Sequence, residues 1–404
     1  MKIVNYFKEN YNKYISVLYA ILPFLLGSII IFRYCCSEDH FNMSDFNDHI
    51  MYASFWQQGI FDFDHVYSHI YSYPLFHWIT AALEFVVGDM SVSGVIVSVV
   101  SLILTTVFMR NIALKHIRLD TPIQKYALDF FCITVVFISG IAGPLTGGTY
   151  YMPYGTPNVW HNPTYLPMRP FAVLSIYYFY KLYNSLFEDK NGNNAALKNA
   201  VLFAVMLFLS VLAKPNFALF FLVGAGLVVA VKMFKKFSIA SIKSGAVIFA
   251  CVLPTMVLML VQKQFCDTHA DTISFALQLR PISSVFSLHT LKGIASLCIP
   301  VITYFAYNGR RLIGKDIVYT IVMIMFAVSL VFWYGTVQGI DTLTNYIWSY
   351  YLSLFLASAI SAIYSVRDIK NKIYWAIFGT SWGLMLLCGA IYMMRIAMVG
   401  QYNI

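Results

Sequence analysis

Most of the ionisable side chains that could carry out chemistry lie in one segment, residues 33–89. The protein has 18 acidic residues and 9 histidines, and this segment alone holds eight of the acids and five of the histidines. They are Glu38, Asp39, Asp45, Asp48, Asp62, Asp64, Glu84, Asp89, His40, His49, His65, His69 and His77. Because the rest of the chain is mostly apolar, we expect proton-transfer chemistry to be located in this segment.

Asp45 and Asp48 are the candidates for a general base. A short helix over residues 46–58 would place Asp45 and His49, four residues apart, on one face. A carboxylate that removes a proton from an alcohol must lie within hydrogen-bond reach of the hydroxyl, in a partly desolvated place. A loop folded onto the end of a helix bundle provides such a place. The alternative is that Ser44 and Asp45 only cap this helix.

Asp62 and Asp64 could hold a metal ion. They are two residues apart, so in an extended segment both carboxylates face the same way. That arrangement suits a divalent cation, Mg²⁺ or Mn²⁺, that bridges phosphates. The alternative is a pair of solvated loop acids. His65 and His69 are four residues apart, but their tyrosine-rich surroundings favour packing at the membrane interface.

The stretch from Tyr150 to Tyr165 is rich in aromatic, proline and amide residues. Prolines fix the backbone, flat aromatic rings stack on sugar rings, and amides supply hydrogen bonds. The alternative is an ordered interfacial loop. Together with the acidic segment, this stretch gives as candidates for binding an acceptor or sugar His49, Tyr73, His77, Trp160, His161, Asn162 and Tyr165.

The composition indicates a polytopic membrane protein. Of the 404 residues, 59% are hydrophobic and 11% are charged, whereas soluble domains carry about 25% charge. The formal net charge of +9 is explained by cytoplasmic loops, where Lys and Arg collect, so we expect no nucleic-acid partner. No polar run is long enough to form a soluble module, and residues 1–404 are therefore expected to form a single integral membrane domain.

Apolar runs of about 15–22 residues predict an all-α bundle with eleven membrane-spanning helices. We place them near residues 14–32, 91–109, 126–145, 170–184, 198–213, 216–232, 243–262, 291–307, 317–334, 346–364 and 373–394. Residues 74–87 are also apolar, but this run is too short to span and is interrupted by Glu84. We expect it to form an amphipathic helix at the membrane surface.

The distribution of positive charge supports this assignment. With residues 74–87 left outside the spans, 20 of the 27 basic residues fall in loops on one side. The positive-inside rule assigns that side to the cytoplasm. The N-terminus is then cytoplasmic and the C-terminus extracytoplasmic, in what we expect to be a bacterial plasma membrane. The outer loops are residues 33–90, 145–169, 263–290 and 335–345.

Five cations on the outer side run against this rule: Arg169, Lys214, Lys263, Arg280 and Lys292. An anionic ligand at the outer boundary would explain them, since Arg and Lys bind phosphate. Lys214 is the most informative, because it lies between two apolar runs with almost no loop, where a cation is costly unless paired. The alternative is that these side chains snorkel to lipid headgroups.

The seven cysteines are scattered. Four of them, Cys132, Cys251, Cys298 and Cys388, lie inside apolar runs and are typical of small core residues. A disulfide from Cys35 or Cys36 to Cys266 is a further possibility, and the sequence does not decide it.

These features together resemble the GT-C class of polytopic glycosyltransferases, which use polyprenyl-phosphate-linked sugars. The resemblance covers roughly the first 220 residues. It rests on the acidic first outer loop with Asp45-Phe46-Asn47-Asp48-His49, on Tyr73-Pro74-Leu75-Phe76-His77-Trp78, on His161-Asn162-Pro163-Thr164-Tyr165 and on Lys214-Pro215-Asn216-Phe217. Members of the class often have a Pro-Pro pair where this chain has Tyr73-Pro74.

The resemblance implies transfer of a sugar from a polyprenyl-phosphate-linked donor to a hydroxyl acceptor at the extracytoplasmic face, with inversion. A first-loop aspartate of the class acts as the base or positions the acceptor; Asp45 matches its Asp-x-x-x-His pattern, and Asp48 is the alternative. The donor phosphate would lie on Arg280, Lys214 or Arg169. The implied partners are the sugar lipid, a glycan, lipid or protein acceptor, and the membrane. Some members of the class need a divalent metal.

Two other functions remain open. A polysaccharide polymerase or ligase would share the lipid-linked donor, but would concentrate its functional residues in a larger late loop. A lipid or solute transporter would carry charges in the middle of spans and often internal repeats. This chain shows scarce charge within its spans and no detectable repeat.

The charge asymmetry predicts the outcome of cysteine labelling in intact cells. A cysteine introduced at Asn193 should resist a membrane-impermeant thiol reagent, and one introduced at Gly339 should react. The reverse pattern would overturn the placement of the site on the outer side.

Overall fold

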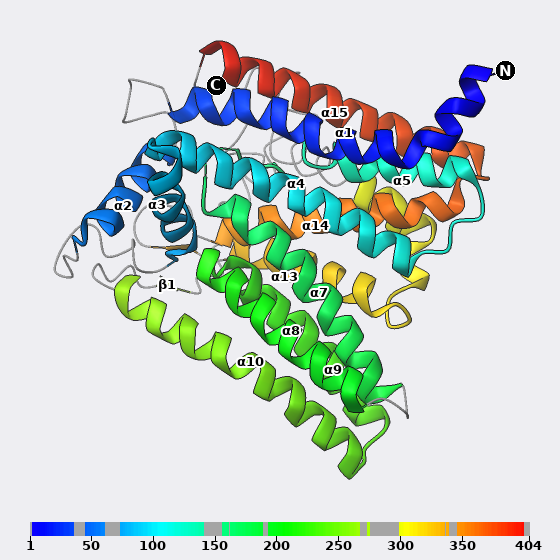
Figure 1. Cartoon of the computed structure of the whole chain (residues 1–404). Coiled ribbons are helices and arrows are strands. Elements are labelled where there is room, and N and C mark those ends of the chain that lie inside the picture. The colour runs from blue at the N-terminus through cyan, green and yellow to red at the C-terminus, as the bar shows by residue number, and fades with distance from the viewer. Residues whose placement is uncertain are drawn as a thin grey trace.

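The computed structural model describes residues 2–35, 45–60, 73–140, 156–160, 162–188, 193–266, 273–274, 299–335, 337–338 and 346–399. Within this part, the chain is a helical bundle with one pair of two-residue strands (Figure 1). The prediction of an all-α membrane bundle is confirmed.

The first half of the chain contains α1 (Lys2–Cys35), α2 (Phe46–Gln58), α3 (Leu75–Val87), α4 (Met90–His116), α5 (Pro122–Thr134), α7 (Tyr165–Phe187) and α8 (Asn193–Ala213). The second half contains α9 (Asn216–Lys235), α10 (Ile239–Cys266), β1 (Ile273–Ser274), a helical segment at 299–307, η2 (Gly309–Arg311), α13 (Ile317–Gly335), β2 (Val337–Gln338), α14 (Tyr346–Ser365), η3 (Val366–Asp368) and α15 (Lys372–Val399). β1 and β2 are antiparallel, which joins the predicted outer loops 263–290 and 335–345.

Six helices in the described residues are long and apolar enough to cross a membrane. They are Met90–His116, Ala195–Ala213, Asn216–Lys235, Ile239–Lys263, Trp348–Asp368 and Lys372–Met398. Shorter apolar helical stretches lie at Tyr14–Ile29, Leu75–Val87 and Ile317–Trp333. The count of eleven spans and the orientation of the termini stay predictions.

α2 and α3 pack on each other and on α4 at one end of the bundle, on the left of Figure 1. Their bounds agree with the helices that the sequence predicted at 46–58 and 74–87. Each helix stops at a glycine in the left-handed region, Gly59 with φ 67° and Gly88 with φ 76°. α3 is about 20 Å long, shorter than the ~30 Å apolar core of a bilayer. It buries Phe76 and exposes Phe85 and Val86, as a surface-lying helix would.

α14 is the central helix of the bundle. Every residue of its membrane-length window is buried, and α13, α9 and α5 contact it. Small side chains recur along it at every fourth position, which allows neighbouring helices to approach closely. These buried small residues are Ser349, Ser353, Ala357, Ser361 and Ser365.

α5 is shorter than the span expected at 126–145. The helix ends at Thr134, and the buried chain continues through a turn into non-helical backbone up to residue 140. The side-chain amide of Asn158 donates to the carbonyls of Val135, at 2.7 Å, and Ile138, at 2.9 Å. Non-helical backbone is tolerated at membrane depth only where protein groups bond it. Asn158 supplies those bonds, and the apolar pattern alone could not reveal this.

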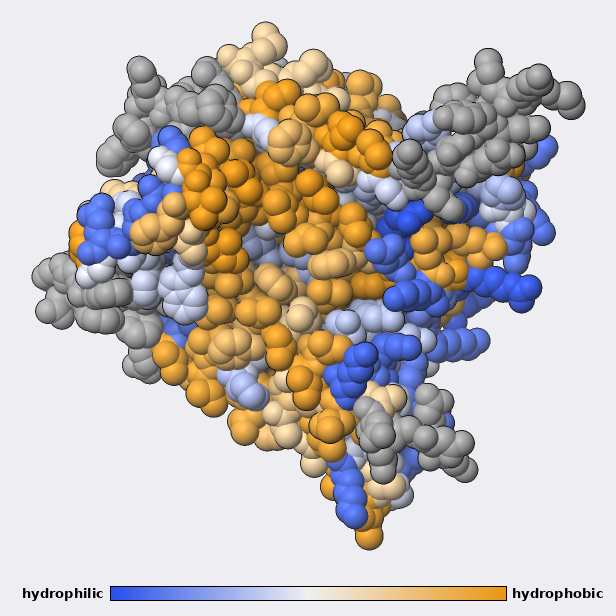
Figure 2. All heavy atoms as spheres, viewed as in Figure 1, coloured by the Kyte–Doolittle hydropathy of each residue, from blue (hydrophilic) through white to orange (hydrophobic). Residues whose placement is uncertain are grey.

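The end of the bundle opposite α2 and α3 carries exposed lysines at the ends of several helices, and we call it the basic end. They include Lys115, Lys181, Lys235, Lys315 and Lys372. Figure 2 shows hydrophilic residues gathered at this end, on the right, beside an apolar front face.

Two polar networks tie helices together near the basic end. In the first, the buried Asp129 carboxylate on α5 pairs with Arg110 Nε on α4 at 2.5 Å and accepts the hydroxyl of Tyr11 on α1 at 2.7 Å. A buried carboxylate is costly unless it is paired and hydrogen-bonded, and here it is both. This network fixes α1, α4 and α5 relative to one another.

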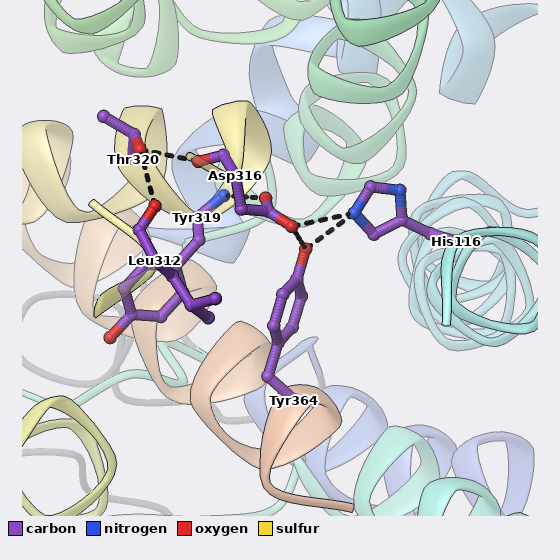
Figure 3. A network of polar contacts seen from close by, with 6 residues as sticks. All are labelled: His116, Leu312, Asp316, Tyr319, Thr320 and Tyr364. Carbon is purple, nitrogen blue, oxygen red and sulfur yellow. Dashed lines mark hydrogen bonds and ion pairs between the residues drawn. The ribbon is translucent and has the colours of Figure 1, made fainter. Parts of the chain in front are cut away.

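The second network joins α4, α13 and α14 (Figure 3). Asp316, just before α13, accepts the hydroxyl of Tyr364 at 2.7 Å and the backbone N–H of Tyr319 at 2.9 Å, and His116 Nε2 lies 3.3 Å from it. Burial by itself would raise the pKa of Asp316, but these hydrogen bonds outweigh it and hold the pKa below its usual value. Asp316 is therefore held as a carboxylate where three helices meet.

Gly389 on α15 is the point where this helix meets the non-helical segment after α5. A Cβ at Gly389 would overlap the backbone carbonyl of Phe137, whereas one at Gly383 would meet nothing within 4 Å. We expect Gly389→Ala to lower the free energy of unfolding by about 1–3 kcal/mol through overpacking. Gly383→Ala is the matched control and should not destabilise. Thermal unfolding in detergent measures both, and equal stability of the two variants would contradict the close approach.

Candidate active site

Asp45 lies at the start of α2, where the sequence offered either a helix cap or a general base. Its side chain makes no capping hydrogen bond. Instead, its Oδ2 accepts a hydrogen bond of 2.6 Å from the side-chain amide of Asn162, which is distant in the chain. Asp45 is half-buried, and its Oδ1 has no hydrogen-bond partner among the described residues. One carboxylate oxygen is therefore free of hydrogen bonds to the described residues, as a base requires.

Asn162 is placed by the start of α7. Its side-chain oxygen accepts the backbone N–H of Tyr165 at 3.1 Å and the hydroxyl of Thr164 at 2.8 Å. Asn-Pro favours a turn, and Pro163 is tolerated at a helix start because it lacks an N–H. These bonds fix the amide plane, so that its NH₂ group points at Asp45.

Lys214 completes the cluster from the short link between α8 and α9. Its ammonium donates to Asn162 Oδ1 at 3.1 Å and to Thr164 Oγ1 at 3.3 Å. The Nζ atom also lies 4.4 Å from the ring centre of Trp348 and 5.4 Å from that of Tyr73. An ammonium has three N–H groups. One N–H is therefore left without an acceptor among the described residues, between two aromatic faces.

The site is positively charged and poorly hydrated. The side chain of Lys214 is only 5% exposed, and Lys214 forms no ion pair among the described residues. Burial disfavours its charged form and lowers the pKa of the Lys214 ammonium from 10.5 to about 8, against a smaller opposite effect of Asp45. Lys214 thus remains a cation at neutral pH, with no ion-pair partner in the part of the chain that the structure describes.

Arg169, one turn into α7, is a second buried cation beside this cluster. It is 1% exposed, and it donates to Asn158 Oδ1 at 2.9 Å and to the Pro157 carbonyl at 3.1 Å. Its guanidinium stacks on the rings of Tyr165, at 4.8 Å, and Phe355, at 4.5 Å. Like Lys214, it forms no ion pair with a carboxylate of the described residues.

The other predicted site residues occupy different positions. His49 and His77 are buried between α2 and α3, where His49 Nδ1 lies 2.8 Å from His77 Nε2. Trp160 is buried against Phe137. Asp48 is exposed on α2. The acceptor-binding role given to these side chains stays a prediction, and the structure shows the two histidines as a link between the two helices.

Several predicted residues lie outside the described part of the chain. They are Asp62, Asp64, His161, Arg280 and Cys36, together with the side chains of Cys35 and Cys266. In the part that the structure describes, no three His, Cys, Asp or Glu side chains gather as metal ligands. The divalent cation and the disulfide therefore stay predictions.

Sequence reasoning missed Thr164, Trp348 and Asn158. Thr164 lies inside the motif at residues 161–165. Its position next to Pro163, at the start of a helix, could have identified it as a residue that positions the site. Trp348 sits at the end of an apolar run, where an aromatic residue is typical of an interfacial belt. Its contact with Lys214 joins segments far apart in the chain, and no local pattern records it.

No family model matches the sequence. No curated protein matches it either. Among solved structures, the fold matches the archaeal oligosaccharyltransferase AglB from Archaeoglobus fulgidus in complex with an inhibitory peptide and a dolichol-phosphate, with a TM-score of 0.52 and 12% identity over 98% of this chain and 56% of that chain. A structure of the Archaeoglobus fulgidus oligosaccharyltransferase tethered to an acceptor peptide containing the NVT sequon matches with a TM-score of 0.50 and 12% identity over 99% of this chain and 56% of that one.

The chain therefore spans little more than half the length of these proteins. At this level of identity, the likeness concerns the fold. The chain thus shares its fold with part of these oligosaccharyltransferase structures.

The buried charge of Lys214 predicts a pH-dependent effect on stability. The lowered pKa means that the unfolded chain binds more protons than the folded protein between about pH 8 and pH 10.5. We therefore expect Lys214→Met to raise the stability of the ligand-free protein at pH 7 by up to about 3 kcal/mol, and this gain to shrink as the pH rises to 10.

Unfolding in detergent between pH 7 and 10 measures this gain, with the exposed Lys236→Met as control. A Lys214→Met protein that is less stable than the parent at pH 7 would show that the contacts of Lys214 outweigh its burial.

Proposed function

We propose that this chain is a glycosyltransferase that transfers a sugar from a polyprenyl-phosphate-linked donor to a hydroxyl acceptor. The reaction takes place where α2, α7, α9 and α14 begin, at the extracytoplasmic face if the predicted orientation holds. The observation that carries the proposal is the Asp45–Asn162–Lys214 chain of hydrogen bonds. It holds a carboxylate beside a buried cation that has no ion-pair partner within the described part of the chain.

The buried cations favour a phosphate ligand. Lys214 and Arg169 both lie in a low-dielectric place where an unmatched positive charge is costly. A lipid phosphate would supply the missing negative charge, and the remaining N–H of Lys214 would donate to it. The dolichol-phosphate in the structure of AglB supports a lipid phosphate as ligand of this fold.

The aromatic rings around Lys214 fit the rest of the donor. Tyr73 and Trp348 flank the ammonium on two sides, and flat rings of this kind pack on sugar faces. α3, which begins just after Tyr73, exposes apolar side chains such as Phe85 and Val86. It would separate the sugar from the lipid while the polyprenyl tail stays in the membrane.

Asp45 acts as the base in the proposed reaction. Its open carboxylate oxygen takes the proton of the acceptor hydroxyl, and the acceptor oxygen attacks the anomeric carbon of the donor. The bond from that carbon to the phosphate oxygen breaks, and polyprenyl phosphate leaves with the bonding electrons. Attack opposite the leaving group inverts the configuration. Lys214 stabilises the negative charge that develops on the phosphate. Stabilisation of developing charge by fixed groups is usually the largest contribution to enzymatic rate enhancement.

Asp45→Asn tests this role, because it keeps the side-chain shape and removes the proton acceptor. We expect turnover to fall by about 10²–10⁴-fold, the usual contribution of general-base catalysis. Donor binding should change little, since the phosphate contacts remain. The assay is transfer from a synthetic polyprenyl-phosphate sugar in liposomes, scored beside donor binding.

Asp48→Asn is the matched control, because Asp48 lies on the same helix but is exposed. Its turnover should stay close to that of the parent. Near-normal transfer by Asp45→Asn would remove the base from this site. Donor binding without any transfer by the parent protein would favour the transporter over the enzyme.

A further inference from the structure

An apolar cavity lies in the half of the bundle near the basic end, far from Asp45. It has a volume of about 90 Å³ and is enclosed by α4, α7, α13 and α14. Its walls are almost entirely apolar and include Met109, Ile112, Ile176, Val322 and Ile360. This volume corresponds to about three water molecules, yet water needs two or more polar partners to be stable in a cavity. A short length of hydrocarbon fits these walls better than water.

Two polar side chains of the lining, His116 and Tyr364, bond each other and Asp316 (Figure 3). The single hydroxyl proton of Tyr364 goes to Asp316 at 2.7 Å. His116 Nε2, 2.7 Å from the Tyr364 hydroxyl oxygen, must therefore be the donor in that contact. The Tyr364 hydroxyl, the Asp316 carboxylate and His116 Nε2 are thus bonded to one another at the side of the cavity.

The cavity reaches the surface where α4 and α7 meet, beside the start of α13. Most of the lining is buried, and the half-exposed residues are Ile112 and His116 on α4, Tyr177 and Tyr180 on α7, and Val318 on α13. Lys115 follows Ile112 by three positions and Lys181 follows Tyr177 by four, so each lysine neighbours one of these half-exposed residues on its own helix. Both lysines are exposed, and neither forms an ion pair among the described residues.

An apolar cavity beside two exposed lysines fits an amphipathic ligand that carries a negative charge. A hydrocarbon chain enters the apolar part, and a negative group on the same molecule meets the lysines. In membranes, basic pockets between helices bind anionic lipid headgroups, and each basic residue near the surface contributes about 1 kcal/mol.

We propose that this cavity binds a short part of one acyl chain of an anionic phospholipid, with the phosphate between Lys115 and Lys181. The site is separate from the Asp45–Asn162–Lys214 cluster. Along α14, its lining begins at Leu356, about 12 Å beyond Trp348, and extends to Tyr364. It does not depend on the proposed function, because it uses none of the residues assigned to catalysis or donor binding.

Titration of the purified protein in detergent, followed by native mass spectrometry, tests the proposal. The probes are dioleoylphosphatidylglycerol, which is anionic, and dioleoylphosphatidylcholine, which is zwitterionic with the same chains. We expect the first anionic lipid to bind about tenfold more tightly. Lys115→Gln combined with Lys181→Gln should weaken its binding about 30-fold, the effect of losing two surface cations.

The matched control is Lys236→Gln combined with Lys243→Gln, which removes the same charge from exposed positions outside the cavity lining. It should leave lipid binding unchanged. Ala113→Leu narrows the cavity from α4 and should weaken both phospholipids. Ala359→Leu narrows the cavity from α14 and should have the same effect on lipid binding. It replaces Ala113→Leu in the test if that variant fails to fold.

Three results would overturn the proposal. The first is equal binding of the two phospholipids by the parent protein. The second is an effect of the control pair as large as that of Lys115 and Lys181. The third is displacement of the phospholipid by undecaprenyl phosphate at lower concentration, which would assign the cavity to a polyprenyl chain instead.

Discussion

The amide of Asn162 is the group on which the proposed site depends. Its NH₂ bonds Asp45 and its oxygen accepts from Lys214, so one planar group sets both charges. A direct ion pair would bring the carboxylate and the ammonium together and neutralise both. The interposed amide keeps them apart, which leaves one carboxylate oxygen and one ammonium N–H without a hydrogen-bond partner among the described residues. The side-chain oxygen of Asn162 also accepts hydrogen bonds from the hydroxyl of Thr164 and from the backbone N–H of Tyr165 at the start of α7.

This arrangement costs stability and is useful only with a ligand. Lys214 and Arg169 are buried without a carboxylate partner in the described residues. Hydrogen bonds to amide oxygens and stacking on aromatic rings offset part of the penalty. By contrast, Asp129 is paired with Arg110 and Asp316 is hydrogen-bonded on several sides. The fold thus neutralises charge near the basic end, where it serves structure, and leaves charge unmatched where an anion is proposed to bind.

Local pattern was enough to predict the helices, but not the contacts of the candidate site residues. α2 and α3 followed from a polar helix start at Asp45 and from a short apolar run at 74–87, and Lys214 was singled out as a cation in an apolar setting. That Asp45 meets Asn162 depends on packing between segments that are 117 positions apart, which no periodicity encodes. α5 was overestimated, because the chain leaves the helix after Thr134 and the side chain of Asn158 then bonds the carbonyls of Val135 and Ile138. His49 and His77 were chosen for their chemistry, yet they bond each other.

α14 connects the two ends of the molecule and fixes the geometry of both. Near its start, Ser349 accepts the amide of Asn216 at 3.1 Å, and Trp348 faces Lys214. Near its end, Tyr364 bonds Asp316. The helix contains neither glycine nor proline, so it has no point at which one half can turn independently of the other. A slip by one residue would rotate it by about 100°. That rotation would withdraw Trp348 from the ammonium and break both hydrogen bonds at once. The aromatic wall of the proposed site is thus held in register by contacts at both ends of one buried helix.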